Sequence, residues 1–319
     1  MSLVTVVIPN LNGMKYLKGC LDALRAQTLQ DFQTILIDNG SRDQSSSFVR
    51  TNYPEVTVVE FDHNTGFCEA VNTGIKMARG KYVVLLNNDT RACPSFLKEL
   101  TEGMERHPGA FSCASMMLRM DTPDLIDDAG DYYCALGWAF AMGKGKRKEQ
   151  FSKERKIFAS CGGASIYRRD LLLSLGLFDE AHFAYLEDID IGYRARIAGY
   201  ENWYIPAAQV LHAGSASSGS AYNLFKIRHA SKNSILLVYK NMPAGQIILN
   251  APLLLAGFLI KVLFFARMGF GKEYLHGLIR GIGSLDPDKK VRFRMKNLRY
   301  YIQIQLELWA NLARRIQSA

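Results

Sequence analysis

An alternation of short apolar runs with helix-like segments extends to residue 89 and constrains the fold more than any other feature of the chain. The apolar runs have the length and composition of buried strands, and they lie at Val4–Pro9, Thr34–Asp38, Val56–Phe61 and Lys81–Leu86. The segments between them have helical spacing of apolar residues or helix-capping residues, and they lie at Met14–Gln27, Ser45–Asn52 and Glu69–Ala78. This order predicts βαβ units and a parallel sheet.

Each of these predicted strands ends in polar residues. The four tips are Pro9-Asn10, Asp38-Asn39, Asp62-His63-Asn64 and Asn87-Asn88-Asp89. Ligands in open α/β sheets bind at the carboxyl edge of the strands, so four polar tips on one edge predict a binding cleft. Asn and Asp are also ordinary turn residues, and a single tip therefore carries little weight. Asp89 alone is either a helix cap or a carboxylate that holds a metal-bound phosphate.

The composition is that of a folded globular chain. It has 319 residues, of which 48% are hydrophobic and 22% charged, enough for one large α/β domain or two smaller ones. No basic segment precedes the first strand, so we expect no signal peptide. The six cysteines show no zinc-type spacing, and we expect reduced thiols in a cytoplasmic protein.

Positive charge is concentrated in the last third of the chain. Residues 224–319 hold 16 Lys and Arg against 4 Asp and Glu, a net charge of +12, whereas the whole chain carries +9. A basic region of this kind predicts an anionic partner, either phospholipid or nucleic acid. The stretch Gln246–Ala266 is too apolar for a nucleic-acid face and no nucleic-acid motif is present, so we expect a membrane surface and no nucleic acid.

Three arrangements are open for Gln246–Ala266. Its length is close to the ~20 residues that span a bilayer, but Pro252, Lys261 and the following Arg267 weaken a spanning helix. A helix or hairpin in the membrane interface and a buried core helix are the alternatives.

The C-terminus predicts a basic amphipathic helix of the kind that a peripheral membrane protein needs. Its apolar stripe consists of Val291, Met295, Leu298, Ile302, Leu306, Trp309, Leu312 and Ile316. Basic residues are expected at its start, namely Arg292, Arg294, Lys296 and Arg299.

From Val4 to about Pro243 the motifs together resemble those of family 2 glycosyltransferases. The N-terminal motifs are Val7-Ile8-Pro9-Asn10-x-Asn12-Gly13, Ile37-Asp38-Asn39-Gly40-Ser41-x-Asp43, and Asn87-Asn88-Asp89 in the place of the family's Asp-x-Asp. The segment Asn64-x-Gly66-Phe67-x-x-Ala70-x-Asn72-x-Gly74 matches a signature of the bacterial rhamnosyltransferase-like branch. The later motifs are Gly176-x-Phe178-Asp179-Glu180, Tyr185-x-Glu187-Asp188-x-Asp190-x-x-x-Arg194, Pro206 and His212.

The resemblance implies a GT-A, Rossmann-like α/β fold with a mixed, mostly parallel sheet flanked by helices. We expect a glycosyltransferase domain over residues 1–223, with a nucleotide-binding half at 1–109 and an acceptor and catalytic half at 110–223. Residues 224–319 would form a helical, basic and apolar membrane-associating region.

The resemblance also implies roles for single residues. Asp188 is expected to be the base of inverting transfer with Glu187 beside it, and repulsion between adjacent carboxylates tends to raise one pKa. Asp38 would accept a hydrogen bond from the nucleotide base, and Asn87 would lie near the ribose. The remaining nucleotide-sugar contacts are expected from Pro9, Asn10, Asn12, Asn64, Gly66, Asn72, Asn88 and Gly163.

Asp89 and His212 are the metal ligands that the resemblance implies. A hard divalent cation, Mn²⁺ or Mg²⁺, can neutralise the charge that grows on the diphosphate as the sugar leaves, and an imidazole ligand favours Mn²⁺. Asn87 stands where the family has a first Asp, so this site carries less negative charge.

The sequence thus predicts an inverting, metal-dependent glycosyltransferase of bacterial cell-surface polysaccharide synthesis. The donor would be a dTDP- or UDP-type sugar, with rhamnose as a candidate, and the acceptor a saccharide, lipid-linked at the inner face of the plasma membrane. One alternative is sugar transfer to polyprenyl phosphate. Another, from a different class, is a catalytically inactive nucleotide-sugar-binding protein, which Asn87 would favour.

Overall fold

The computed structural model describes residues 2–214 and 222–317 of the chain. The first part contains β1 (Val4–Asn10), α1 (Met14–Arg25), β2 (Phe32–Asn39), α2 (Ser45–Asn52), β3 (Thr57–Phe61), α3 (Phe67–Met77), β4 (Tyr82–Leu86), β5 (Thr90–Ala92) and α4 (Phe96–Arg106). The same part, which ends at residue 214, also contains β6 (Ala110–Arg119), β7 (Ile126–Asp128), β8 (Asp131–Cys134), β9 (Trp138–Ala141), β10 (Arg155–Ile157), β11 (Ala164–Arg168), α5 (Arg169–Ser174), α6 (Glu187–Ile197) and β12 (Glu201–His212). Four longer helices follow, α7 (Leu224–Asn241), α8 (Ala244–Arg267), α9 (Gly271–Gly283) and α10 (Leu298–Gln317).

A mixed sheet forms the centre of the molecule, with the strand order β10-β12-β6-β11-β4-β1-β2-β3. β4, β1, β2 and β3 are parallel to one another, and β12 is parallel to β6. β11 joins the two parallel sets by running antiparallel to both β4 and β6. The predicted mixed, mostly parallel α/β sheet is confirmed, and parallel pairing brings the polar tips of β1, β2 and β4 to one edge.

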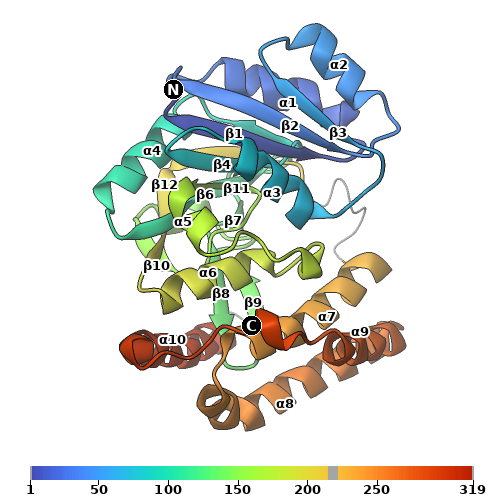
Figure 1. Cartoon of the computed structure of the whole chain (residues 1–319), viewed down its shortest axis with the longest axis vertical. Coiled ribbons are helices and arrows are strands. Elements are labelled where there is room, and N and C mark those ends of the chain that lie inside the picture. Colours follow the sequence, from blue (N-terminus) through green and yellow to red (C-terminus); the bar gives the residue numbers. More distant parts are fainter. Residues whose placement is uncertain (1, 215–221, 318–319) are drawn as a thin grey trace.

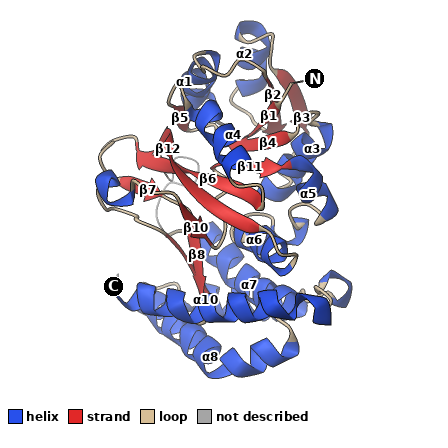
Figure 2. Cartoon of the chain, turned by 90° about the vertical axis from the view of Figure 1, so that its left-hand side faces the viewer, coloured by secondary structure: helices blue, strands red, loops and turns tan. Residues whose placement is uncertain are grey.

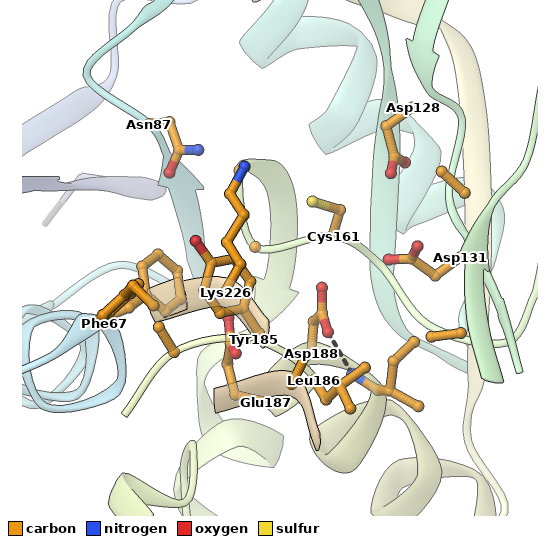
Figure 3. Close-up of a pocket in the computed structure, with 18 of the residues that line it drawn as sticks. Phe67, Asn87, Asp128, Asp131, Cys161, Tyr185, Leu186, Glu187, Asp188 and Lys226 are labelled. Carbon is orange, nitrogen blue, oxygen red and sulfur yellow. Dashed lines mark hydrogen bonds between the residues drawn. The ribbon is translucent and has the colours of Figure 1, made fainter. Parts of the chain in front are cut away.

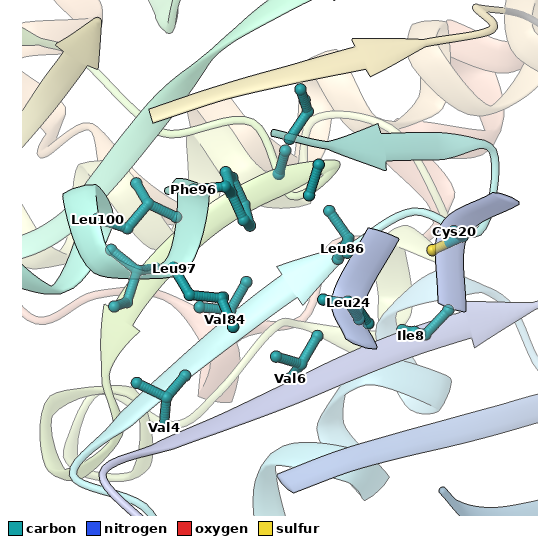
Figure 4. Close-up of a cluster of buried hydrophobic side chains, with 14 of the residues drawn as sticks. Val4, Val6, Ile8, Cys20, Leu24, Val84, Leu86, Phe96, Leu97 and Leu100 are labelled. Atoms are coloured by element: carbon teal, nitrogen blue, oxygen red, sulfur yellow. The ribbon is translucent and has the colours of Figure 1, made fainter. Parts of the chain in front are cut away.

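Both faces of this sheet are covered, which explains why its central strands are continuously apolar. Residues Val4, Val6 and Ile8 of β1 pack on one face against α1 and α4, as Figure 4 shows. Val7 points to the opposite face, where it packs with the α3 side chains Val71 and Ile75. The core therefore fixes the register of β1, and with it the position of the tip at Asn10.

Helices α7 to α10 form a layer at the end of the molecule away from α1 and α2 (Figures 1 and 2). The Lys240 ammonium of α7 ties this layer to the rest, lying 2.7 Å from Asp179 and 2.9 Å from Asp190 in a buried cluster. Asp190 also pairs with Arg194 at 2.7 Å, the helical pair that the i, i+4 spacing predicts.

Several predicted boundaries differ from the observed ones. The helix expected at Glu69 begins at Phe67, because Gly66 with φ of +93° turns the chain just before it. The C-terminal helix begins at Leu298, so the predicted basic start is wrong for the three residues before it, Arg292, Arg294 and Lys296.

Helix α8 is long and apolar enough to cross a membrane. Only 17% of its apolar 18-residue window is buried inside the protein. The alternative of a buried core helix for Gln246–Ala266 is therefore wrong. The side chains that α8 does bury are Gln246, Asn250 and Leu254, together with Gly257.

Candidate active site

A cavity of about 1250 Å³ opens at the carboxyl edge of β1, β2 and β4. It exceeds the roughly 300–1,000 Å³ of a typical small-ligand pocket, so it has room for two substrates. Its walls come from the strand tips, from the β7–β9 region, from the loop before α6 and from the C-terminal helices. Of the predicted nucleotide-sugar contacts, seven line it: Pro9, Asn10, Asn64, Gly66, Asn87, Asn88 and Gly163.

Side-chain amides cross-link the strand tips. The Asn88 Nδ2 donates to Asn10 Oδ1 at 2.6 Å, and the Asn10 Nδ2 donates to Asp38 Oδ1 at 2.7 Å. The Asn39 Nδ2 similarly donates to Asn64 Oδ1 and to the Gly66 carbonyl, both at 3.0 Å. The tips therefore form one preorganised edge rather than four independent turns.

Three predicted contacts do not line the cavity. Asp38 is buried beneath Asn10, to which its carboxylate is bonded, and Asn12 bonds the neighbouring loop through Arg42 N. Asn72 is buried in α3, where its amide donates to the Phe178 carbonyl at 2.8 Å and accepts from Phe178 N at 3.0 Å. These contacts orient the walls of the cavity, and direct nucleotide contact by the three side chains stays a prediction.

The two predicted metal ligands lie side by side. Antiparallel pairing of β5 with β12 sets His212 opposite Thr90, which brings the His212 Nε2 to 3.3 Å from Asp89 Oδ1. On its other side the His212 ring is bonded through Nδ1 to Asp127 Oδ2 at 2.7 Å. Asp127 in turn lies 3.2 Å from the Lys144 ammonium.

This carboxylate–imidazole arrangement is the usual surrounding of a metal-bound histidine, because it orients the ring and leaves Nε2 for the ion. Burial alone would lower the pKa of His212, but the hydrogen bonds to Asp127 and Asp89 outweigh it and raise that pKa to about 9. The His212 hydrogen bond lowers the pKa of Asp127 to about 2. The donor set of a carboxylate and an imidazole fits a divalent cation, and binding the ion would require His212 to lose a proton.

Glu187 and Asp188 occupy the first turn of α6 at the other side of the cavity. Figure 3 shows the Asp188 carboxylate pointing into the open space below Cys161, with Asp131 and Asp128 beside it. Burial raises the pKa of Asp188, and burial followed by repulsion from Asp188 raises the pKa of Glu187. Among the described residues the Glu187 Oε2 has no hydrogen-bond partner.

The loop before α6 has a strained backbone. Phe183, Tyr185 and Leu186 all have positive φ, at 62°, 72° and 68°, a conformation that side chains other than glycine rarely adopt. Asn233 of α7 holds this loop through one amide group, which donates to the carbonyls of His182, Ala184 and Tyr185 at 2.8, 2.9 and 2.7 Å. Strain of this kind persists only where the surroundings fix it, and it clusters at functional sites.

Some residues of the cavity were missed by sequence reasoning. Asp127, Asp128 and Asp131 lie around β7 and β8, and the segment Asp127-Asp128-Ala129-Gly130-Asp131 was a signal of the same kind as Asn87-Asn88-Asp89. Ligand atoms of Asp128, Asp131 and Cys161 lie within 4.8 Å of one another. Burial raises the pKa of all three, which keeps Cys161 a thiol and makes the trio a poor match for a hard cation.

The sequence profile of glycosyl transferase family 2 matches residues 5–176, more than half of the chain. An N-acetylglucosaminyl-diphospho-decaprenol L-rhamnosyltransferase of Mycobacterium tuberculosis is 28% identical over 232 residues, which are 64% of this chain and 74% of that protein. A glycosyltransferase of Streptococcus pneumoniae is 24% identical over 185 residues, covering 57% of this chain and 60% of that one.

Solved structures share the fold at low identity. S. aureus TarS in complex with UDP-GlcNAc superposes with a TM-score of 0.59 at 16% identity, over 91% of this chain and 83% of that one. A Pyrobaculum calidifontis mannosyltransferase in complex with GDP-Man and Mn²⁺ gives 0.57 at 16% identity, over 90% and 77%. GalNAc-T7 with UDP, GalNAc and Mn²⁺ gives 0.59 at 16%, and the chain spans about half the length of that protein, 48%.

Proposed function

Because the chain belongs to glycosyl transferase family 2, we propose that it moves a sugar from a nucleotide-diphosphate donor to a lipid-linked saccharide with inversion at the anomeric carbon. Rhamnose from a dTDP- or UDP-type donor is the leading candidate, since the mycobacterial relative is a rhamnosyltransferase. The observation that carries this proposal is that a single cavity joins Asp89 and His212 to Asp188.

The donor diphosphate would lie at the Asp89 end of the cavity. Asp89 and the His212 Nε2 would hold a divalent cation, which neutralises negative charge on the departing diphosphate when bound. Asp127 would keep the His212 ring oriented, and Asn87 would contact the nucleotide without adding a charge. Gly163 leaves space beside Asn87, since a Cβ there would lie 3.1 Å from the Asn87 amide nitrogen.

Asp188 would act as the base. The acceptor hydroxyl oxygen forms a bond to the anomeric carbon while the bond from that carbon to the diphosphate oxygen breaks, and the hydroxyl proton passes to Asp188. Inversion requires the base and the leaving group on opposite faces of the sugar, and Asp188 of α6 and Asp89 after β4 line the same cavity from different elements. A carboxyl group with a raised pKa is also a stronger base than an ordinary Asp.

The membrane side of the proposal is supported by the inverted polarity of α8. Its inward face carries Gln246 and Asn250, and Asn250 exchanges two amide hydrogen bonds with Gln305 of α10, at 2.7 and 2.9 Å. Its outward face is apolar, with Ile248 exposed by 74% and Leu255 by 70%. A helix that buries its polar side chains and exposes its apolar ones is favourable when lipid covers the outward face.

Neighbouring helices extend the same apolar surface. Exposed apolar side chains of α9 and α10 include Leu275, Ile279, Ile282, Ile302 and Leu306. Ile302 and Leu306 belong to the stripe that the sequence predicts. With the net charge of +12 over residues 224–319, this surface suits the anionic inner face of a bacterial plasma membrane, where lipid-linked acceptors are found.

A panel of nucleotide sugars with Mn²⁺ or Mg²⁺, scored by thermal shift and then by transfer, tests the proposal. A donor that binds the native state raises the melting temperature by mass action. We expect a shift with one donor, cation-dependent transfer to a lipid-linked saccharide, and a product of inverted anomeric configuration by NMR. A shift without transfer would favour the inactive binding protein, absence of a shift with every donor would refute the proposal, and transfer to polyprenyl phosphate alone would favour that alternative acceptor.

A further inference from the structure

Lys261 is the one charged residue in the apolar stretch of α8 between Ala244 and Ala266. It follows Gly257 by one helical turn on the inward side of the helix and lines the active-site cavity. Gly257 packs directly on the β8–β9 turn, since a Cβ there would lie 2.2 Å from the Leu136 carbonyl oxygen, and the Trp138 Nε1 donates to the Gly257 carbonyl at 3.1 Å. The position of Lys261 is therefore fixed by close backbone packing.

Lys261 has no counter-ion among the described residues. In the part of the chain that the structure describes, the Lys261 ammonium forms no ion pair and no hydrogen bond, and its nearest specific contact is the Trp138 ring at 5.5 Å. Burial lowers its pKa to about 8, so it remains mostly protonated at pH 7. A half-buried cation without a partner is unfavourable unless a ligand brings negative charge to it.

The surroundings of Lys261 differ from those of the donor end. Lys144 lies beside Asp127, and Asp127 also interacts electrostatically with Lys226, so these two lysines belong to the Asp89 and His212 side. The titratable groups near Lys261 are instead Cys134 of β8, a neutral thiol whose pKa burial raises further, and the cationic Arg315 of α10, so neither supplies a negative charge. The cavity thus has a second cationic position, on the wall to which α8 contributes.

We propose that Lys261 binds the diphosphate that links the acceptor saccharide to its prenyl chain. This inference rests on the proposed function and specifies how its acceptor is held. The saccharide would reach inward to Asp188, while the prenyl chain would leave the cavity over the outward face of α8, where Leu259 and Leu263 are exposed by 59% and 55%. The saccharide would then lie in the polar cavity, the diphosphate at the Lys261 ammonium, and the prenyl chain on the apolar face of α8.

Binding of farnesyl diphosphate to the full-length protein tests the inference without catalysis. The donor end is first saturated with UDP or dTDP and Mn²⁺, so that the probe cannot bind there, and affinity is measured by calorimetry. Lys261→Met should weaken binding by about tenfold or more, the effect of losing a charge-assisted contact. Lys261→Arg should restore it, and Lys272→Met, which removes an exposed α9 lysine of equal charge, should leave it unchanged.

Two further measurements separate the possible failures. In transfer assays Lys261→Met should raise KM for a prenyl-diphosphate saccharide, with kcat and the KM for an alkyl glycoside lacking phosphate unchanged. Wild-type affinity of Lys261→Met for farnesyl diphosphate would overturn the inference even if transfer proceeds. An equal loss of binding to phosphatidylcholine–phosphatidylglycerol vesicles would also overturn it, by assigning Lys261 to phospholipid headgroups. Failure of the wild type to transfer any sugar would instead refute the proposed function.

Discussion

Replacement of Asn233 by Ala should impair catalysis far more than donor binding. The Asn233 amide nitrogen is the shared donor to three carbonyls of residues 182–185, and no atom of Asn233 lines the cavity. The amide has two hydrogens, so one N–H is shared between two of the carbonyls, and at about 1 kcal/mol for each N–H the clamp is worth roughly 2 kcal/mol. Holding a non-glycine residue at positive φ costs of order 1–3 kcal/mol, and the loop has three such residues, so it should relax without the clamp.

Relaxation of this loop would displace Asp188, which lies two residues after the last strained position, Leu186. If the lost 2 kcal/mol enters the barrier for transfer, kcat falls about 30-fold. Gly66, one of the predicted donor contacts, packs against Phe183 of this loop, whereas the predicted metal ligands Asp89 and His212 lie outside the loop, so most of the thermal shift by the nucleoside diphosphate with Mn²⁺ should remain.

Steady-state kinetics of Asn233→Ala and Ser231→Ala provide the test. Ser231 is an equally buried polar residue of α7, but its hydroxyl bonds only to carbonyls of its own helix, so its removal controls for general disturbance. A wild-type kcat in Asn233→Ala would refute the idea that these hydrogen bonds hold Asp188 in place for catalysis. An equal loss of kcat in both variants, or a parallel loss of nucleotide binding, would show that α7 acts only through stability.

Four other outcomes are expected. Asp188→Asn should abolish transfer while nucleoside-diphosphate binding persists in thermal shift. Because burial raises the Asp188 pKa, wild-type kcat/KM should fall as the pH drops through a value above the ordinary Asp range and recover when the pH rises. A flat pH profile would count against Asp188 as the base. EDTA should stop transfer and Mn²⁺ restore it, and rates indifferent to chelation would remove the metal. Changing Leu255, Leu259 and Leu263 together to Gln should release the protein from lipid vesicles without lowering its melting temperature, since all three are exposed; unchanged co-sedimentation would contradict the membrane face. Lys240→Met removes the buried cation that Asp179 and Asp190 share, but Asp190 keeps Arg194 and Asp179 keeps Lys289, so the loss should stay below the about 3–5 kcal/mol of an orphaned buried charge and lower the melting temperature by less than about 6 °C; an unchanged melting curve would contradict a role in stability.

The parallel strands β1 to β4 and the polar motifs at their tips were predictable because they depend on local pattern. The strand tips carry short-range signals, and parallel pairing then brings Asn10, Asn64 and Asn87 to one edge regardless of what lies between them. The proximity of Asp89 and His212 followed from the family resemblance rather than from spacing, since β5 and β12 are separated by more than a hundred residues.

The remaining site residues were not predictable, for two different physical reasons. Asp127 matters through its hydrogen bond to His212, a contact that antiparallel pairing of β7 with β6 creates and that no local pattern reports. The orientation of α8 was hidden because a helix that is apolar almost all round has no periodicity to show which face is inward. Only the packing of Gln246, Asn250 and Gly257 determines that Lys261 lines the cavity.

The same packing bears on whether the C-terminal region can be separated from catalysis. Asn233 holds the loop before the predicted base, Lys240 neutralises Asp179 and Asp190 beneath that loop, and Lys261 lines the cavity. These three residues occupy successive parts of α7 and α8, helices whose continuation carries the exposed apolar surface. A chain cut near residue 223 would therefore lose the loop clamp together with the membrane face, so truncation cannot distinguish anchoring from catalysis. Substitutions on the outward face of α8 can, when transfer is measured with an alkyl glycoside that lacks the prenyl chain, because they leave every one of these inward contacts in place.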